Sequence, residues 1–183
     1  MQIAILSDIH GNSVALDAVL ADIANQGTID AYWLLGDLVA LGPDPVGVRQ
    51  RLYQLPNHQA IRGNTDRWLT DIHHEFPLTP AALSQAARAN ESDPLELAYA
   101  MTWAQGALTA SGDLAWIAAL PLEYRVVLPD GTRVLCVHAS PGQDDGLGIR
   151  PVMRDQEIAE MIDGTDADLI FVGHTHWALD RPI

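Results

Sequence analysis

The fold class of this chain is decided by residues 3–12, which read IAILSDIHGN. Four apolar residues predict a short buried strand over 3–6, and the apolar spacing beyond the polar turn predicts a helix starting near Val14. A second apolar run predicts a strand over 32–35. Strand, loop, helix and strand in this order form a βαβ unit, and such units build mostly parallel sheets. We therefore expect an α/β fold.

Predicted strands and helices continue to alternate after residue 35, until a stretch with helical features only begins at residue 67. We expect a helical insert over residues 67–118, where Asp93 and Pro94 mark a helix start and Met101 and Trp103 lie in the core. A turn at 129–131 predicts a hairpin. The other expected elements are a helix over 46–55, strands over 59–62, 124–128, 132–138 and 169–172, and a helix over 155–162.

The composition excludes several functions. The chain has 183 residues, enough for a single domain over 1–183, and a net charge of −14. This acidity argues against sequence-independent nucleic-acid binding and against binding to an anionic membrane. All ten basic residues are arginine. Without lysine, P-loop nucleotide binding and Schiff-base or pyridoxal-phosphate chemistry are excluded.

The single cysteine and the first residues indicate where the protein is found. Cys136 lies in an apolar run and has no second cysteine to pair with, so we expect it to be a core residue. No cationic signal-peptide pattern precedes residues 3–6, and the apolar runs are shorter than the ~20 residues that span a bilayer. We expect a soluble, cytoplasmic protein.

Side chains of the metal-ligand type follow the predicted strands in five clusters. Any one cluster has an ordinary explanation, because an aspartate can cap a helix, an asparagine can close a turn, and a single histidine is usually structural. Their recurrence at successive strand ends is harder to explain, since these ends converge on one crevice in an open α/β sheet. His58, His73 and His74 lie elsewhere and are interpreted as structural or solvated. The clusters are Asp8 with His10, Asp37, Asn64, His138, and His174 with His176.

The chemistry of these seven side chains favours transition metals. Carboxylate, amide and imidazole donors suit Mn, Fe, Zn or Ni ions better than Ca²⁺. Seven ligands exceed the needs of one ion but suit two divalent ions about 3.5–4 Å apart, which could hold both oxygens of an in-line displacement. Asp37 is the natural bridging ligand.

The order Asp-x-His, Gly-Asp, Gly-Asn-x-Asp, His and Gly-His-x-His resembles the calcineurin-like metallophosphoesterase family, from Asp8 to His176. The resemblance implies a four-layer α/β/β/α sandwich of two mixed sheets. It implies that Asp8, His10 and His176 hold one ion. It further implies that Asn64, His138 and His174 hold the second, with Asp37 shared.

The resemblance also implies a reaction. A hydroxide bridging the two ions attacks phosphorus in line, without a covalent enzyme intermediate, and Asn64 helps to neutralise charge on the phosphoryl oxygens. Many phosphatases of the family carry a histidine as general acid where this chain has Thr65. A threonine is a poor acid, so we expect a small phosphodiester or activated ester as substrate, as in phosphodiesterase-like bacterial and archaeal members, with His10 or water giving the proton.

Three further expectations concern neighbouring residues and alternatives. Arg62 and Arg67 flank the Asn64 motif and could reach a phosphate, although pairing with surface acids is the simpler interpretation, and Asp66 is expected to orient a ligand histidine. The main alternative function is a non-enzymatic protein-interaction scaffold on the same fold. Relatives usually continue past the last histidine motif with strands that complete one sheet. A strand over 177–183 could form here, but the uncompleted sheet would leave an open edge, which indicates a homo-oligomer or a shortened chain.

Overall fold

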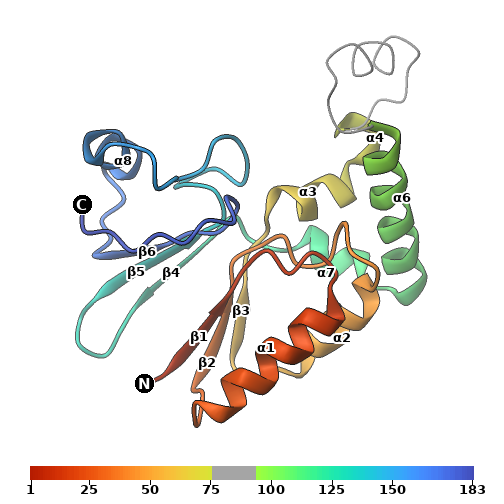
Figure 1. Ribbon diagram of the computed structural model, residues 1–183, viewed down its shortest axis with the longest axis horizontal. Helices are drawn as coiled ribbons and strands as arrows, with labels where there is room; N and C mark the ends of the chain where they lie inside the picture. Colours follow the sequence, from red (N-terminus) through yellow and green to blue (C-terminus); the bar gives the residue numbers. More distant parts are fainter. Residues whose placement is uncertain (76–93) are drawn as a thin grey trace.

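The first sheet of the computed structural model, which describes residues 1–75 and 94–183, has three parallel strands in the order β1-β2-β3 (Figure 1). Helices link the strands and pack on one face of the sheet. This confirms the predicted βαβ order. The elements are β1 (Ile3–Leu6), α1 (Ser13–Asn25), β2 (Ala31–Leu34), α2 (Pro45–Gln54) and β3 (His58–Ala60).

The two linking helices begin at polar caps. The Asn12 side chain accepts a hydrogen bond from the Ala15 amide at 2.9 Å, and the Asp44 side chain accepts one from the Gly47 amide at 2.9 Å. Pro45 occupies the first turn of α2, where its missing N–H costs nothing. Because Asn12 caps α1, helix capping does not explain the aspartate at position 8.

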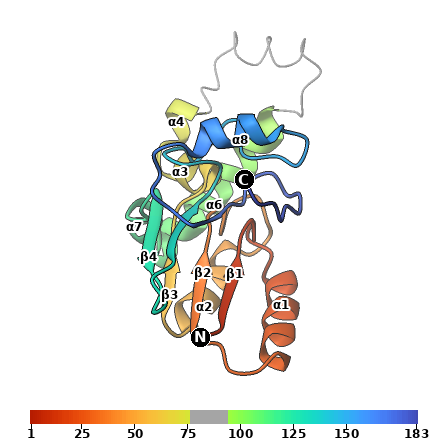
Figure 2. The same cartoon turned by 90° about the vertical axis from the view of Figure 1, so that its left-hand side faces the viewer.

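The second sheet has the order β4-β5-β6. Strands β4 (Glu123–Val127) and β5 (Arg133–Val137) are antiparallel and form the predicted hairpin, whereas β6 (Leu169–Phe171) runs parallel to β5. Helix α8 (Asp155–Ile162) lies on the outer side of this sheet, near one end (Figures 1 and 2). Only the second sheet is mixed. The first is wholly parallel in the described residues, because a helical crossover joins each pair of its strands.

The two sheets pack face to face through a small apolar cluster. Trp33 and Ile61 from the first sheet meet Val134 and Cys136 from the second. The Trp33 ring packs edge-on against Tyr124, with 5.8 Å between ring centroids. Cys136 is fully buried, as predicted, and burial raises the pKa of its thiol to about 12. The sheets are thereby fixed against each other.

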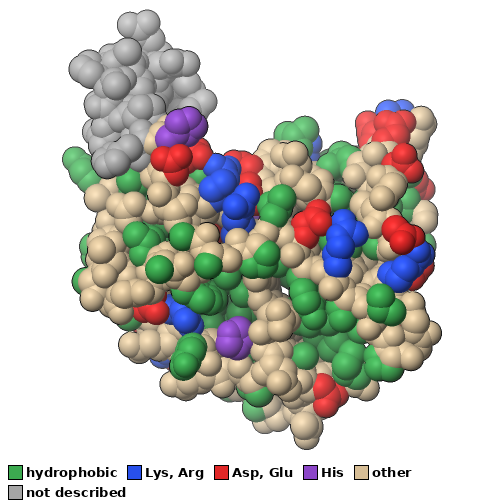
Figure 3. All heavy atoms as spheres, turned by 180° about the vertical axis from the view of Figure 1, so that it is seen from behind, with side chains coloured by type: hydrophobic (Ala, Val, Ile, Leu, Met, Phe, Trp, Pro, Cys, Tyr) green, Lys and Arg blue, Asp and Glu red, His purple; other side chains and the backbone are tan. Residues whose placement is uncertain are grey.

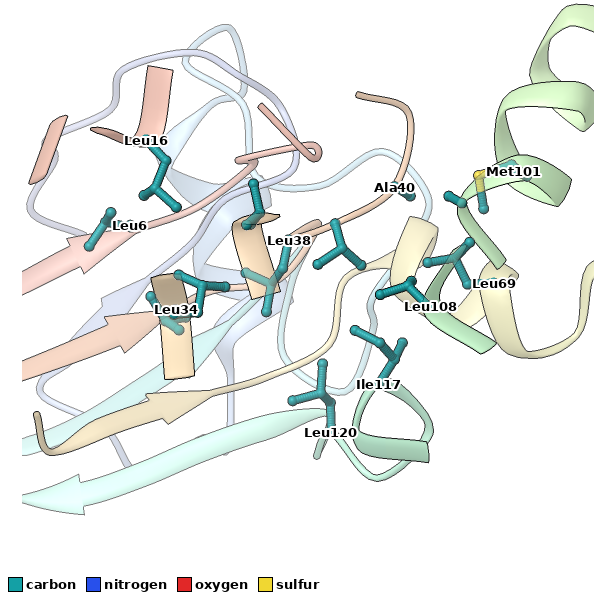
Figure 4. Close-up of a cluster of buried hydrophobic side chains, with 14 of the residues drawn as sticks. Leu6, Leu16, Leu34, Leu38, Ala40, Leu69, Met101, Leu108, Ile117 and Leu120 are labelled. Atoms are coloured by element: carbon teal, nitrogen blue, oxygen red, sulfur yellow. The ribbon is translucent and has the colours of Figure 1, made fainter. Parts of the chain in front are cut away.

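The predicted helical insert consists of several helices packed together. Its described helices are α3 (Asn64–Thr70), α4 (Ile72–Glu75), α6 (Pro94–Ser111) and α7 (Leu114–Ala118). Figure 4 shows Leu69 of α3 beside Met101 and Leu108 of α6, with Ile117 of α7 nearby. The predicted core role of Met101 is confirmed, but the prediction for Trp103 is wrong, since Trp103 is 52% exposed. The helical part begins at Asn64 rather than at 67. Residues 76–93, including the predicted helix-start residue Asp93, lie outside the described residues.

Residues beyond β6 form no strand. The prediction of a strand over 177–183 is wrong, because this segment runs as irregular chain, with Arg181 donating to the Met153 carbonyl at 2.7 Å. Strand β6 is therefore the edge of its sheet among the described residues, and self-association at this edge stays a prediction. No helix in the described part of the chain is long and apolar enough to cross a membrane.

Candidate metal centre

The loops that follow the strands meet in the centre of the molecule, where the carboxyl ends of β1, β2 and β3 face the ends of β5 and β6 (Figures 1 and 2). The backbone joins these loops directly. The Asp8 amide donates to the Gly36 carbonyl at 3.1 Å, and the Gly173 amide donates to the His138 carbonyl at 2.8 Å. All seven side chains predicted as ligands are found on these loops or on the first turn of α3, and contacts connect them to one another.

One side of the site joins the two ends of the chain. The Nε2 atom of His176 lies 3.2 Å from Oδ1 of Asp8 and 3.3 Å from Nε2 of His10. The amide of His174 donates to both carboxylate oxygens of Asp8, at 3.2 and 3.0 Å. Asp8, His10 and His176 each offer a ligand atom within 4.8 Å of the others. Side chains separated by more than 160 residues thus share one small space.

Asp37 lies between this group and the other side of the site. Its Oδ2 atom is 3.7 Å from Nε2 of His10 and 3.5 Å from Nε2 of His138. Its Oδ1 atom accepts a hydrogen bond from the Thr65 amide at 2.9 Å, which fixes the carboxylate. Asp37 is only 3% exposed. The central position predicted for Asp37 agrees with this geometry.

The other side of the site gathers Asn64, His138 and His174. The Oδ1 atom of Asn64 lies 3.2 Å from Nε2 of His138 and 3.0 Å from Nδ1 of His174. The second ring nitrogen of each histidine faces a backbone carbonyl, that of Leu35 at 2.7 Å for His138 and that of Gly146 at 2.8 Å for His174. Each ring therefore lies between two oxygen acceptors, a backbone carbonyl and the Asn64 amide oxygen. With a cation on the Asn64 side, the ring proton would lie on the carbonyl side and the lone pair would face the cation.

This arrangement provides a test of whether metal ions fit. In the neutral site, an amide oxygen and two imidazole lone pairs face one another at hydrogen-bond distance. Three acceptors in contact repel one another, and a cation bound among them would remove this repulsion. Histidines anchored on carbonyls through the far nitrogen are the usual arrangement of metal ligands. The donor set therefore fits divalent transition-metal ions.

The backbone of the site is held in an unusual conformation. Asp8, His10, Asp37, His174 and His176 all have positive φ angles, between 47° and 69°. For residues other than glycine this left-handed conformation costs roughly 1–2 kcal/mol each, and such residues cluster at functional sites. Five residues with positive φ angles in one centre indicate that the surrounding fold holds the backbone in a conformation that these residue types disfavour.

Close backbone approach explains the glycines of the motifs. A Cβ atom on Gly63 would lie 2.1 Å from Oδ1 of Asp37, and one on Gly173 would lie 2.0 Å from Oγ of Ser7 and 2.8 Å from Oδ2 of Asp8. No real Cβ contact is this short. These two positions therefore require glycine so that neighbouring loops can bring their ligand atoms together.

Burial and charge oppose each other in this centre. Burial acts to raise the pKa of the Asp37 carboxyl, but the adjacent His138 and His10 imidazoles outweigh it and hold that pKa below its usual value. Burial acts to lower the pKa of His138, and Asp37 outweighs it, so the pKa of His138 is raised. Burial and the charge of Asp37 raise the pKa of Asp66 to about 7. The charges of Asp37 and His138 thus stabilise each other in the buried part of the site.

Several residues near the ligands differ from expectation. Asp66 does not orient a histidine, because its carboxylate accepts the amides of Leu38, at 3.1 Å, and Gly63, at 3.0 Å. It therefore joins the Asp37 loop to the Asn64 loop. Arg62 and Arg67 both pair with Asp144, in agreement with the simpler interpretation. Thr65 is buried, and its hydroxyl has no hydrogen-bond partner among the described residues.

Two parts of the centre were not predicted. The Gly146 carbonyl anchors His174, and Asp144 is a buried acid close to it in sequence. The glycine-rich stretch 142–148 signals a loop, but nothing in its residue types shows what the loop contacts. Among the histidines interpreted as structural or solvated, the side chain of His74 is 80% exposed, and His58, the first residue of β3, contacts the Leu55 carbonyl at 2.8 Å.

Comparison with known proteins shows the family of this chain. The sequence matches the calcineurin-like phosphoesterase family over residues 1–178. The chain belongs to this family. The expected α/β fold with two sheets and outer helices is thereby confirmed.

Individual relatives match more than three quarters of the chain. An uncharacterized protein of Methanocaldococcus jannaschii is 30% identical over 95% of this chain and 62% of its own length. A symmetrical bis(5'-nucleosyl)-tetraphosphatase of Erwinia tasmaniensis is 27% identical over 78% of this chain and 57% of its own length. The chain thus spans less than two thirds of these curated relatives.

Solved structures show the same fold. A metallophosphoesterase from Sphaerobacter thermophilus has a TM-score of 0.65 and 32% identity, and the match covers 96% of this chain and 61% of that one. A hypothetical protein from Pyrococcus horikoshii has a TM-score of 0.73 and 22% identity, with coverage of 93% and 68%. At 22% identity, the similarity to the Pyrococcus horikoshii protein shows the fold alone.

Proposed function

We propose that residues 1–183 form a metallophosphoesterase domain that uses two divalent ions to hydrolyse phosphodiesters. The observation that carries this proposal is the convergence of seven side chains, spread from Asp8 to His176, on one centre in which lone pairs face one another. A structural role for one ion would leave several of these side chains unused. A scaffold would have no need to maintain five strained residues in the same centre.

The ligands divide as the family resemblance implies. Asp8, His10 and His176 would hold one ion, and their mutual contacts support this grouping. Asn64, His138 and His174 would hold the other. Asp37 would be shared, because one of its oxygens faces both His10 and His138. The second close group of carboxylates and histidines, Asp8, Asp37 and His138, crosses this division and supports a single joint centre.

The chain's own residues have distinct roles in the reaction. Ions bound here would activate water and draw negative charge from the phosphoryl oxygens. Asn64 is fixed on the first turn of α3 and would neutralise charge as it develops on phosphorus-bound oxygen. The departing alkoxide needs a proton. Thr65 is buried and too weak an acid, so His10 or solvent would supply it.

This lack of a strong acid favours particular substrates. An ester whose leaving group is a weak base, such as an aryl phosphodiester or another activated ester, releases it without a proton more readily than a simple alkyl ester does. The names of the tetraphosphatase relatives suggest testing a dinucleoside tetraphosphate as well. We propose a small phosphoester substrate and, in keeping with the net charge of −14, no general nucleic-acid binding.

The experiment measures metal content and turnover together. Purified protein loaded with Mn²⁺ is assayed on bis-p-nitrophenyl phosphate, on the corresponding monoester and on a dinucleoside tetraphosphate. We expect two ions per chain and faster hydrolysis of the diester than of the monoester. Asp37→Ala and His138→Ala should abolish turnover, whereas His74→Ala, which removes an exposed histidine, should not.

Two results would contradict the proposal. Retained hydrolysis in both Asp37→Ala and His138→Ala would remove the mechanism. Two bound ions without hydrolysis of any of the three compounds would favour the interaction scaffold.

A further inference from the structure

Two arginines meet one buried carboxylate beside the centre. Asp144 is 7% exposed and lies on the loop after β5. The Arg62 Nε atom donates to it at 2.7 Å, and the Arg67 Nε atom donates to its two oxygens at 3.2 and 3.3 Å. Arg67 also donates to Asp145 at 2.9 Å. Because a buried carboxylate is stable only when paired in this way, these contacts fix the loop in place.

The same loop holds the ring of His174. The Gly146 carbonyl, two residues after Asp144, accepts from Nε2 of His174 at 2.8 Å. Gly148 lies so close to this ring that an added Cβ would be 2.9 Å from its Cδ2 atom. Both ring nitrogens face an oxygen acceptor, and the Gly146 carbonyl, the nearer of the two, favours the tautomer with the proton on Nε2. The Nδ1 lone pair then faces Oδ1 of Asn64 at 3.0 Å.

These contacts form a closed ring around half of the centre. Arg62 and Arg67 stand two residues before and three residues after Asn64, so Asp144 ties both sides of the segment that carries this ligand. The ring runs from Asn64 to His174, to the 144–146 loop, and back through the arginines. A substitution at Asp144 would therefore alter the positions of both Asn64 and His174, although Asp144 contacts neither side chain.

We propose that Asp144 is a positioning residue, which holds the 144–146 loop on Arg62 and Arg67 so that the Gly146 carbonyl fixes the ring and tautomer of His174. This inference rests on the proposed function, because it gives His174 the role of a ligand through Nδ1. Arg62 and Arg67 act here as structural partners of Asp144 rather than as phosphate contacts.

The direct test is the tautomer of His174 in metal-free protein. Two-bond ¹H–¹⁵N correlation spectra distinguish a protonated from an unprotonated ring nitrogen, at about pH 8, where an ordinary imidazole is neutral. In the wild-type protein we expect His174 with the proton on Nε2 alone. In Asp144→Asn the paired charge is lost and the loop loosens, so we expect a mixture of both tautomers. Mn²⁺ affinity should fall about tenfold.

Controls separate positioning from general destabilisation. Asp168→Asn breaks another arginine–carboxylate pair, with Arg133 at the far end of β5, and should leave the His174 tautomer unchanged. If Asp144→Asn does not fold, Arg67→Gln keeps the Arg62 pair and should show the same mixture.

The tautomer of His174 in Asp144→Asn decides whether Asp144 is a positioning residue. A single Nε2-protonated form in the folded variant, as in Asp168→Asn, would overturn it, whatever the change in thermal stability. If the wild-type chain binds no Mn²⁺, the proposed function fails, but the tautomer comparison still decides the role of Asp144.

Discussion

At the residue scale, the centre depends on glycines, which let neighbouring loops approach closely, as much as on the ligand side chains. Gly63 approaches Asp37 so closely that a methyl group would lie 2.1 Å from the carboxylate and 2.4 Å from the Asp37 amide nitrogen. We predict that Gly63→Ala displaces Asp37, destabilises the fold by about 1–3 kcal/mol and weakens Mn²⁺ binding. Urea unfolding and calorimetric titration with Mn²⁺ measure both effects.

A matched substitution separates crowding from the general effect of adding a methyl group. Gly106 lies within α6 and has no atom within 4 Å of an added Cβ. Gly106→Ala should stabilise the helix, by at most about 1 kcal/mol, and leave metal binding unchanged. Equal Mn²⁺ affinity in Gly63→Ala and Gly106→Ala would show that the close approach has no influence on the centre.

The ligand residues were predictable because their types and positions carry the signal. Asp, Asn and His after successive strands point to one crevice whatever the exact contacts are. The Gly146 carbonyl was not predictable, because a backbone atom has no residue-type signature. Asp144 was equally hidden, since nothing in the sequence distinguishes it from the acidic residues that lie outside the strand-end motifs.

At the element scale, α6 supports α3, the helix that begins at Asn64. Leu108 is fully buried and lies near Leu69 of α3 in Figure 4. We predict that Leu108→Ala lowers the free energy of unfolding by about 2–5 kcal/mol through lost burial and a cavity. Tyr99→Ala, on the same helix but 67% exposed, should cost far less. Similar urea midpoints for the two variants would contradict this packing.

The pairing of β5 with β6 leads to a pH-dependent prediction. Hydrogen bonds and the charge of Arg133 hold the pKa of Asp168 well below its ordinary value of 3.8. A lowered carboxyl pKa adds stability above the ordinary value, and this stability is lost as the pH falls below it. Asp168→Asn should therefore melt earlier than the wild-type chain at neutral pH, with a difference that shrinks below about pH 3.8. A difference independent of pH, measured by thermal melting, would exclude the ion pair as its cause.

Helix and strand order were predictable from apolar periodicity, and two errors have physical reasons. Met101, Ala104 and Leu108 share one helix face, but Trp103 is two residues from Met101 and so points about 200° away from it. The segment 177–183 contains Trp177 and Ile183, which favour strands, but also Asp180 and Pro182, which do not, and it forms no ladder with β6. Strand propensity has little effect without a neighbour to supply hydrogen bonds.

At the scale of the whole molecule, the proposed ions would join the two sheets. The ligands come from β1, β2 and β3 loops on one side and from β5 and β6 loops on the other. On the face shown in Figure 3, arginine side chains lie beside acidic ones, so much of the charge there is paired locally. In the buried centre, Asp37 lies beside His10 and His138, and the proposed ions would bind on these same side chains.

Metal binding should therefore stabilise the entire fold. Ions that bind only the folded chain stabilise it by about 2.7 kcal/mol when their free concentration is 100 times the dissociation constant. We predict that Mn²⁺ raises the melting temperature of the wild-type chain and that excess chelator reverses the increase. His138→Ala should show a much smaller response. Equal responses in the two proteins would place the stabilising ions elsewhere.

The central claim is that residues from Asp8 to His176 together hold a pair of cations. The most direct measurement is the anomalous scattering of Mn²⁺ in crystals of the loaded protein. We predict two peaks about 3.5–4 Å apart, with Asp37 between them and His138 and His176 on opposite sides. A single peak, or manganese bound away from Asp37, would contradict the claim.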